Sequence, residues 1–357
     1  MDYLLPIASK FRLNMGWEYS LIQNESGTVY DGNSLDGRSF HTDTKDYMGS
    51  LYADLRFVRK KFMLGGGVRG EYNHRSDVYN EENNFHSLDF SPRLSVSYNF
   101  TPVTALSLNY NFVVQRPSMS QLNPSPIYVN KYLYIAGNPD LKLAKAHGVN
   151  LGIRLPQNLS FNVSYQYVKN NIFRAILSDK ENPEINVFSF SNLKKTQNLM
   201  LAANYWHIWS WYTFYVNGMY SKPFAKVPYL DGDKHYNKPR YVVHNQHMFR
   251  FNNGLSGSVA LHYYSKSESF PSNMDAHYNI GADLYYKYKQ WNFSLSCNNI
   301  IYKKIVPTTQ RYLNIYSRQE ADLHMRCIAI GVTYRFSKFK DLFQKNKAGE
   351  GTIQRAN

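Results

Sequence analysis

Apolar and polar residues alternate at every second position through most of this 357-residue chain. The segment NFTPVTALSLNYNFVVQRPSMSQLNP (99–124) is typical, because its apolar residues share one side of an extended chain and its polar residues the other. The apolar set is Leu106, Leu108, Tyr110, Phe112 and Val114, and the polar set is Ser107, Asn109, Asn111 and Gln115. This pattern predicts a strand with one apolar and one polar face, which ends where the prolines begin.

The same alternation recurs along the whole chain. It is clear over 11–21, 88–100, 159–167, 278–288, 291–301 and the last part of 318–336, and weaker over 44–58, 62–75, 147–154, 187–205, 210–221, 241–252 and 255–266. With 106–115, these segments predict about fourteen strands. The residues DYLL (2–5) resemble the tail of an earlier strand, which would make the number odd.

The predicted connections alternate between short and long. Short turns are expected at 59–61, 101–103, 155–158, 252–254 and 289–290, and long polar segments near 23–43, 76–86, 116–146, 222–240, 267–276 and 302–317. No apolar run approaches the ~18 residues that a helical membrane span needs. Short turns on one rim and long loops on the other are typical of a transmembrane, antiparallel, up-and-down β-barrel, whose closure pairs every backbone group in the lipid.

Composition agrees with a membrane barrel. Aromatic residues make up 16% of the chain, with 31 Tyr. Many stand beside the predicted short turns, where an interfacial girdle belongs: Tyr98, Phe100, Trp206, Trp209, Trp211, Tyr286, Tyr288 and Trp291. The net charge of +15 is spread over turns and loops without a nucleic-acid motif, so no nucleic-acid partner is predicted.

Four further stretches carry a resemblance to a known family: QRPSMSQLNP (115–124), AGNPDLK (136–142), GGGVRGEYN (65–73) and GVTYRFSK (331–338). In this order and spacing they resemble the carboxy-terminal barrel of the outer-membrane β-barrel protein family related to TonB-dependent receptors. The resemblance implies a barrel of 22 strands in the whole protein, a plug inside it and a TonB-type energising partner. By this resemblance, the chain is similar to roughly the last two thirds of such a barrel, and we expect neither a plug nor an export signal within it. It departs from the family where Leu143 and Ala144 follow Lys142, in place of a proline and an acid.

Two groups of residues are candidates for binding. Arg116, Gln121, Asn123, Asn138 and Asp140 lie in the longest predicted loop, where they either fold the loop or contact a ligand. Four charged residues are predicted to face the lumen, where they line a solute path, contact a plug or are ordinary interior charges: Arg69, Glu71, Arg93 and Asp283.

The chain shows no signature of a catalytic site, so we expect neither an enzyme nor a cofactor. His244 and His247 are three positions apart on one strand, which places their rings on opposite faces and argues against a shared metal. Cys297 and Cys327 are also expected on opposite faces, which argues against a disulfide.

The end of the predicted barrel carries an alternating motif of aromatic residues. The alternation VTYRF, with Tyr334 and Phe336, is either a plain last strand or the signal by which outer-membrane barrels are recognised for insertion, and we predict the latter. The predicted division of the chain is therefore a barrel over 1–337 and a basic, disordered periplasmic tail over 338–357.

The leading hypothesis is a non-enzymatic barrel in the outer membrane of a Gram-negative-type bacterium that takes part in the uptake of a bulky nutrient. The expected partners are outer-membrane lipid, the barrel-assembly machinery, a TonB-type protein acting through a plug, and a surface lipoprotein. Two alternatives remain open: a passive pore or structural barrel, and a non-functional receptor fragment.

Overall fold

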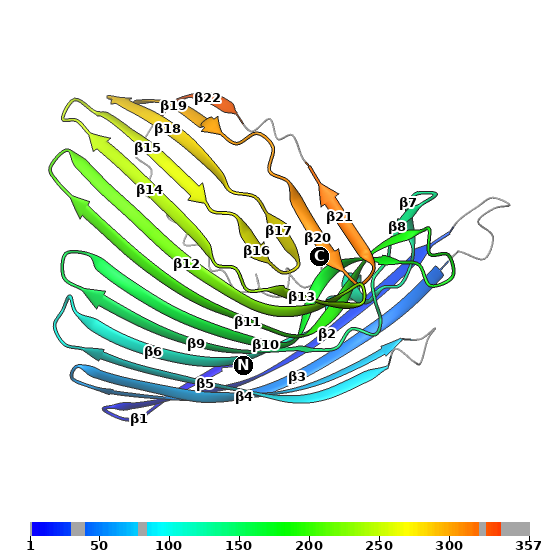
Figure 1. The fold of residues 1–357 in the computed structure, drawn as a ribbon. Coiled ribbons are helices and arrows are strands. Elements are labelled where there is room, and N and C mark those ends of the chain that lie inside the picture. The colour runs from blue at the N-terminus through cyan, green and yellow to red at the C-terminus, as the bar shows by residue number, and fades with distance from the viewer. Residues whose placement is uncertain (1, 30–39, 78–83, 321–325, 337–357) are drawn as a thin grey trace.

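One large antiparallel sheet forms most of the molecule (Figure 1). The computed structural model describes residues 2–29, 40–77, 84–320 and 326–336. Its main sheet has eighteen strands, of which β7, β8 and β13 are short loop strands and the other fifteen make a wall. In spatial order the wall strands are β1 (Asp2–Ala8), β2 (Phe11–Thr28), β3 (Phe40–Arg59), β4 (Phe62–Asp77), β5 (Phe85–Asn99), β6 (Ala105–Gln115), β9 (Ala144–Leu155), β10 (Leu159–Ser178), β11 (Asn186–Ile208), β12 (Tyr212–Tyr229), β14 (Arg240–Arg250), β15 (Leu255–Tyr264), β18 (His277–Tyr288), β19 (Trp291–Tyr302) and β22 (Cys327–Tyr334). Each wall strand pairs with the next in the chain, so the predicted all-β, up-and-down antiparallel architecture is confirmed.

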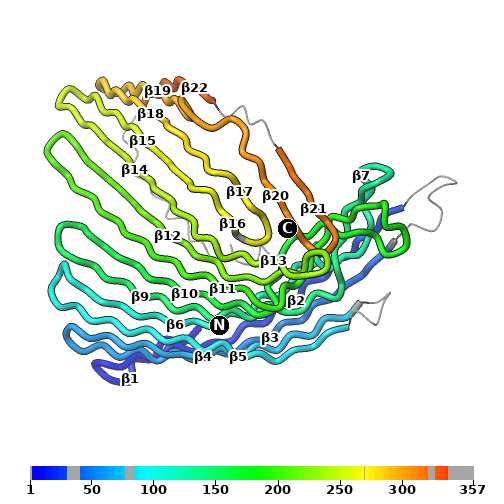
Figure 2. The backbone as a smooth tube through the Cα atoms, viewed as in Figure 1, coloured from blue at the N-terminus to red at the C-terminus, as the bar shows by residue number. Residues whose placement is uncertain are grey.

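The wall curls around an open interior and is not closed in the described residues (Figures 1 and 2). Within that part of the chain, β1 pairs only with β2, and β22 only with β19. The short turns gather at one end of the strands and the long connections at the other, as the alternating lengths predict. No helix among the described residues is long and apolar enough to span a membrane.

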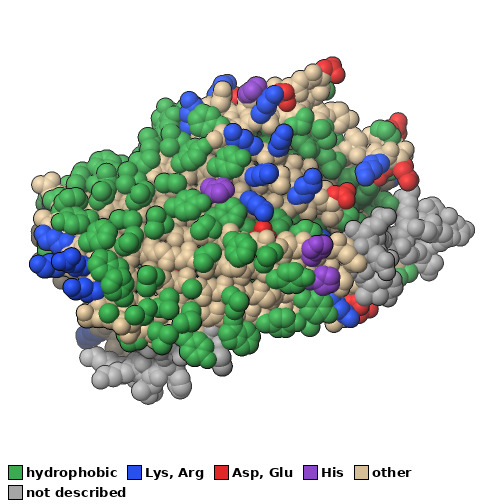
Figure 3. Space-filling model, turned by 90° about the horizontal axis from the view of Figure 1, so that it is seen from below, with side chains coloured by type: hydrophobic (Ala, Val, Ile, Leu, Met, Phe, Trp, Pro, Cys, Tyr) green, Lys and Arg blue, Asp and Glu red, His purple; other side chains and the backbone are tan. Residues whose placement is uncertain are grey.

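The outer, convex face is covered with apolar side chains (Figure 3). Leu51 is 70% exposed and Ile330 is 80% exposed, which would be unfavourable in water and is expected against lipid. The register places apolar residues of neighbouring strands on the same face, as in the row Leu64, Val96, Leu108, Leu151 and Val163.

Aromatic residues form two belts on the outer face, where only one was expected. The belt at the short turns includes Trp291, whose ring centroid lies 4.7 Å from that of Tyr334. The second lies towards the long loops and comprises Tyr19, Tyr72, Tyr110, Tyr220, Tyr241, Tyr263 and Tyr278. Trp206 is a correction to the predicted girdle, because it lies opposite Tyr215, whose hydroxyl donates to Asn204 on the inner face.

The best-packed core lies at the loop end of the wall, where a second layer covers the strands. There a small sheet of β16 (Ser267–Ser269), β17 (Ser272–Met274), β20 (Thr308–Tyr312) and β21 (Ile315–Gln319) covers the upper ends of β10 and β12, together with β13 (Gly232–Tyr236). Phe173 is only 5% exposed and contacts Tyr312 and Phe270 edge-on, with ring centroids 5.0 Å and 4.3 Å away. A wall one sheet thick faces lipid on one side and the interior on the other, so side chains are buried on all sides only where a second layer exists.

The small sheet corrects one predicted strand. The alternation suggested a continuous strand over 318–336, whereas β21 ends at Gln319 in the small sheet and β22 begins at Cys327 in the wall. The predicted tail of 338–357 lies outside the described residues, so the domain division stays a prediction.

Candidate functional site

The long connection between β6 and β9 folds over the inner face of β2 and β3 at the loop end. It contains α1 (Met119–Leu122) and the hairpin of β7 (Ile127–Asn130) and β8 (Leu133–Ile135). Its two conspicuous motifs are hydrogen-bonded to each other: Gly137 N donates to Asn123 O at 2.7 Å, and Asn138 N to Gln121 O at 2.7 Å. A Cβ at Gly137 would lie 2.5 Å from Asn123 O, so this contact requires glycine.

The amide side chains proposed as ligand contacts all have hydrogen-bond partners within the protein, either in the loop or on the wall strands β2 and β11. Gln121 forms a capping box with Ser118 at the start of α1. The Asn123 side chain donates to Ser26 Oγ at 3.0 Å, and the Asn138 side chain donates to Phe190 O at 2.9 Å. Asp140 is exposed and its N–H donates to the Asn138 side chain at 3.0 Å. These contacts favour the loop-folding interpretation, and a ligand-binding role for the four residues stays a prediction.

Arg116, at the start of the loop, joins a chain of ion pairs on the inner face. Its guanidinium donates to Glu71 at 2.6 Å, Glu71 accepts from Arg69 at 2.7 Å, and Arg69 also donates to Glu18 at 2.8 Å. The chain therefore links β2, β4 and the loop. Arg69 and Glu71, which the sequence analysis assigns to the lumen, lie on the face opposite the apolar outer surface.

Asp89 anchors the other side of Arg116. Its carboxylate, 3% exposed, lies 2.9 Å from the ammonium of Lys145 and 3.5 Å from the guanidinium of Arg116. A carboxylate this buried is stable only when it is paired, so the two cations hold β5 and β9 to the base of the loop. Neither Asp89 nor Lys145 was a candidate in the sequence, because only the register shows that they meet.

The remaining inner-face candidates also have partners. Arg93 on β5 pairs with Asp54 on β3, across the intervening Gly67 of β4. Asp283 on β18 accepts from Ser258 Oγ at 3.1 Å. What these charges do for a solute or a plug stays a prediction.

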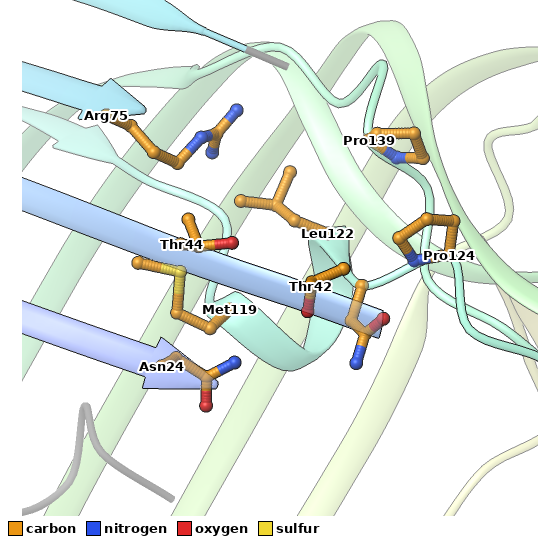
Figure 4. Close-up of a pocket in the computed structure, with 9 residues that line it drawn as sticks. Asn24, Thr42, Thr44, Arg75, Met119, Leu122, Pro124 and Pro139 are labelled. Atoms are coloured by element: carbon orange, nitrogen blue, oxygen red, sulfur yellow. The ribbon is translucent and has the colours of Figure 1, made fainter. Parts of the chain in front are cut away.

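Two pockets lie between the loop and the wall. The first, drawn in Figure 4, encloses about 350 Å³ of space including open solvent and is lined by Asn24, Thr42, Thr44, Arg75, Met119, Leu122, Asn123, Pro124 and Pro139. The second encloses about 1090 Å³ by the same measure and is lined by Ser20, Ile22, Asp46, Met48 and residues 113–119. Met119 contributes to both pockets, so α1 separates two parts of one recess at the loop end of the interior.

The histidines lie on both faces of β14. His244, on the inner face, contacts His262 with ring centroids 4.6 Å apart and bonds to Tyr264 Oη at 3.2 Å. His247, on the outer face, bonds to Tyr212 Oη at 2.6 Å. Within the described part of the chain, no group of three or more His, Cys, Asp or Glu is arranged to hold a metal ion.

Tyr334 and Phe336 lie at the short-turn rim. Tyr334 ends β22, and its ring centroid is 4.7 Å from that of Phe336, which is 87% exposed. Cys297 and Cys327 are both free, and Cys297 is opposite Ile328, which places the two thiols on opposite faces. An insertion signal at Tyr334 and Phe336 stays a prediction.

Solved structures share this architecture. The siderophore receptor PirA from Pseudomonas aeruginosa matches with a TM-score of 0.59 and 16% identity, over 84% of this chain and 52% of that one. The FrpB iron transporter from Neisseria meningitidis matches with a TM-score of 0.61 and 16% identity, over 93% of this chain and 54% of that one. A mutant of the ferric enterobactin receptor PfeA from Pseudomonas aeruginosa, in complex with enterobactin, matches with a TM-score of 0.58 and 16% identity, over 84% of this chain and 48% of that one. The chain thus spans about half the length of the structures it matches, and the likeness is one of fold.

The search of curated proteins found no match. The model of the outer membrane protein beta-barrel family matches residues 1–334. A two-faced antiparallel wall, aromatic belts at both margins and this match together place the chain in the outer membrane of a Gram-negative-type bacterium. The chain belongs to the outer membrane protein beta-barrel family.

Proposed function

We propose that this chain forms the barrel wall of a non-enzymatic receptor that takes part in the uptake of a bulky nutrient. The observation that carries the proposal is the network of ion pairs on the inner face, which leads from Glu18 through Arg69 and Glu71 to Arg116 beneath the loop recess. This network continues to the recess under the loop, where a polar solute that enters from the loop end would meet it. The fold shared with proteins named as a siderophore receptor and an iron transporter supports the same direction.

The first nutrient class to test is an iron–chelator complex, because the names of these structures refer to siderophores and iron. Uptake would draw energy from a TonB-type protein acting on a plug in the interior. A surface lipoprotein over the loops and the barrel-assembly machinery are the further partners we propose.

The test is an uptake assay in cells that differ only in the gene for this protein. Cells are given radiolabelled ferric complexes of catecholate, hydroxamate and citrate type, with and without an uncoupler that collapses the proton gradient. We expect deletion to abolish accumulation of one complex, and the uncoupler to do the same in cells that carry the gene. Accumulation that is unchanged by deletion for every complex would reject iron chelates as the nutrient.

The passive pore is distinguished by the same cells and by the purified protein. A pore would admit solute regardless of the uncoupler, and it would give steady conductance across a planar bilayer. Energised uptake without steady conductance supports the receptor, whereas conductance with uncoupler-insensitive uptake would replace it by the pore.

A further inference from the structure

Three lysines stand side by side across the wall towards its loop end. Lys169 on β10 lies directly opposite Lys145 on β9 and Lys195 on β11. Like charges directly opposite each other destabilise a sheet, so this row requires compensation from another source.

Lys169 and Lys195 continue the alternation of the outer, lipid-facing surface, whereas the Lys145 side chain reaches Asp89 on the inner side of the wall. The ammonium of Lys195 lies 5.5 Å from the ring centroid of Tyr167, and that ring lies 6.0 Å from His147, which in turn is 4.7 Å from Phe112. Phe112 is an even number of positions from Leu108 on β6, so it lies on the same outer face. On β12, Lys222 also follows the outward alternation and lies 5.4 Å from the ring of Phe224. Figure 3 shows Lys and Arg side chains gathered on this face beside the apolar surface, in the half nearer the loops.

The height of the lysines matches the outer margin of the membrane. Lys169 and Lys222 are each ten positions from the residues that begin their strands at the short-turn end, Leu159 and Tyr212. Ten residues at about 3.3 Å each, in strands tilted by about 40°, rise about 25 Å, which is the height of the apolar band of an outer-membrane barrel. The ammonium groups therefore lie where lipid phosphate groups begin.

The protein neutralises only part of this charge. Lys145 is paired with Asp89 at 2.9 Å, and Lys226, further up β12, with Asp233 at 2.8 Å. In the ranges that the structure describes, no carboxylate lies within 4.0 Å of the ammonium of Lys169, Lys195 or Lys222. Three cations without a carboxylate partner in the loop-end half of the lipid-facing wall need an anion that the membrane supplies.

We propose that Lys169, Lys195 and Lys222 form a binding site for the phosphate groups of an anionic lipid in the outer leaflet. Lysine ammonium groups bind phosphate as compact point charges. The rings of Tyr167 and Phe224 provide the amphipathic surface that suits the boundary between head groups and acyl chains. The site depends on the outer-membrane location and not on nutrient uptake, so it stands or falls independently of the receptor function.

The test compares the protein purified from outer membranes in three forms: wild type, K169Q/K195Q/K222Q, and the control K10Q/K60Q/K289Q. The control removes the same charge from the short turns at the opposite rim. Native mass spectrometry measures retained lipid, and titration with diphosphorylated and dephosphorylated lipid A measures affinity. Heat-dependent mobility on a gel confirms that each form is folded.

We expect wild type and control to bind diphosphorylated lipid A alike. The K169Q/K195Q/K222Q form should bind it about 150-fold more weakly, which corresponds to about 1 kcal/mol for each of the three lysines near the membrane surface. Dephosphorylated lipid A should bind all forms equally weakly. Equal binding of diphosphorylated lipid A by all three forms would overturn the proposal.

Two further arms separate the remaining outcomes. The charge-conserving K169R/K195R/K222R form should keep its affinity for diphosphorylated lipid A. A loss of affinity in this form would show that binding depends on local structure and not on the charge of the three lysines. Inorganic phosphate should compete weakly with the lipid. Competition at matched concentration would reassign the site to free phosphate and overturn the lipid assignment.

Discussion

A single missing side chain permits the ion pair between Arg93 and Asp54. The two residues lie on β5 and β3, and the strand between them presents Gly67 at the crossing point. A Cβ at Gly67 would overlap the Asp54 carboxylate and lie 2.7 Å from Ala53 O. Of the three consecutive glycines, the third is therefore the one that must lack a side chain, because the ion pair between β5 and β3 crosses β4 at Gly67.

We expect Gly67→Leu to destabilise the wall by about 1–3 kcal/mol, since it forces the backbone apart and separates a partly exposed ion pair. The matched control is Gly66→Leu on the outer face, where the closest atom to a new Cβ is Leu94 Cδ1 at 3.8 Å. Urea unfolding of the protein in lipid vesicles measures both. Equal losses would contradict the bridging role of Gly67.

At the scale of one element, the two faces of a strand should respond differently to charge. Leu108 is 43% exposed on the outer face of β6, and Asn109 lies on the inner face. We expect Leu108→Lys to cost about 2–4 kcal/mol near the middle of the bilayer, because the ammonium enters hydrocarbon, and Asn109→Lys to cost little. The free energy of folding into lipid vesicles gives both values, and similar costs would rule out a lipid-facing Leu108.

The small sheet at the loop end is held by packing that the wall lacks. We expect Phe173→Ala to cost about 3–5 kcal/mol there, because the ring fills the space between Tyr312 and Phe270. Phe161→Ala on the outer face of the same strand removes the same atoms from lipid and is the control. Limited proteolysis should cut the small sheet of β16, β17, β20 and β21 faster only in the first variant, and unchanged cleavage there would show that this core does not hold the sheet in place.

An ion pair ties the same sheet to the loop after β13, and it should make that sheet sensitive to pH. A hydrogen bond from Lys238, at 2.7 Å, lowers the pKa of Glu268 below its ordinary value. A depressed carboxyl pKa stabilises the fold fully above the unfolded value of about 4.3, and this stabilisation is lost as the pH falls through the depressed pKa. Amide exchange in β16 and β17, corrected for its intrinsic pH dependence, should therefore show weaker protection at pH 3 than at pH 6. Glu268→Gln should remove most of the difference, and a difference that persists would place its cause elsewhere.

For the whole molecule, the sequence predicts the wall far better than the loops. Alternation along a strand that separates lipid from a polar interior is enforced at every position, so β5, β6 and β18 lie within a few residues of their predicted bounds. The small sheet is held by contacts between residues far apart in the chain, such as Ser191 with Tyr312, which no local pattern indicates. In the candidate site too, the sequence predicts some features and misses others. Parity predicts which face Arg69 and Glu71 occupy, whereas the pairing of Asp89 with Lys145 and Arg116 depends on register and loop path.

The last prediction concerns the orientation of the whole molecule in the membrane. This orientation decides whether the long loops and the lysines face the cell exterior or the periplasm. β11 runs the height of the wall, with Glu181 exposed in the connection before it and Ser210 exposed in the short turn after it. Long loops of outer-membrane barrels face outward and short turns face the periplasm. In a background with Cys297→Ser and Cys327→Ser, we expect Glu181→Cys to react with a membrane-impermeant maleimide on intact cells. Ser210→Cys should react only after the outer membrane is permeabilised, and the reverse pattern would place the loop recess in the periplasm and the lysine row at the inner leaflet.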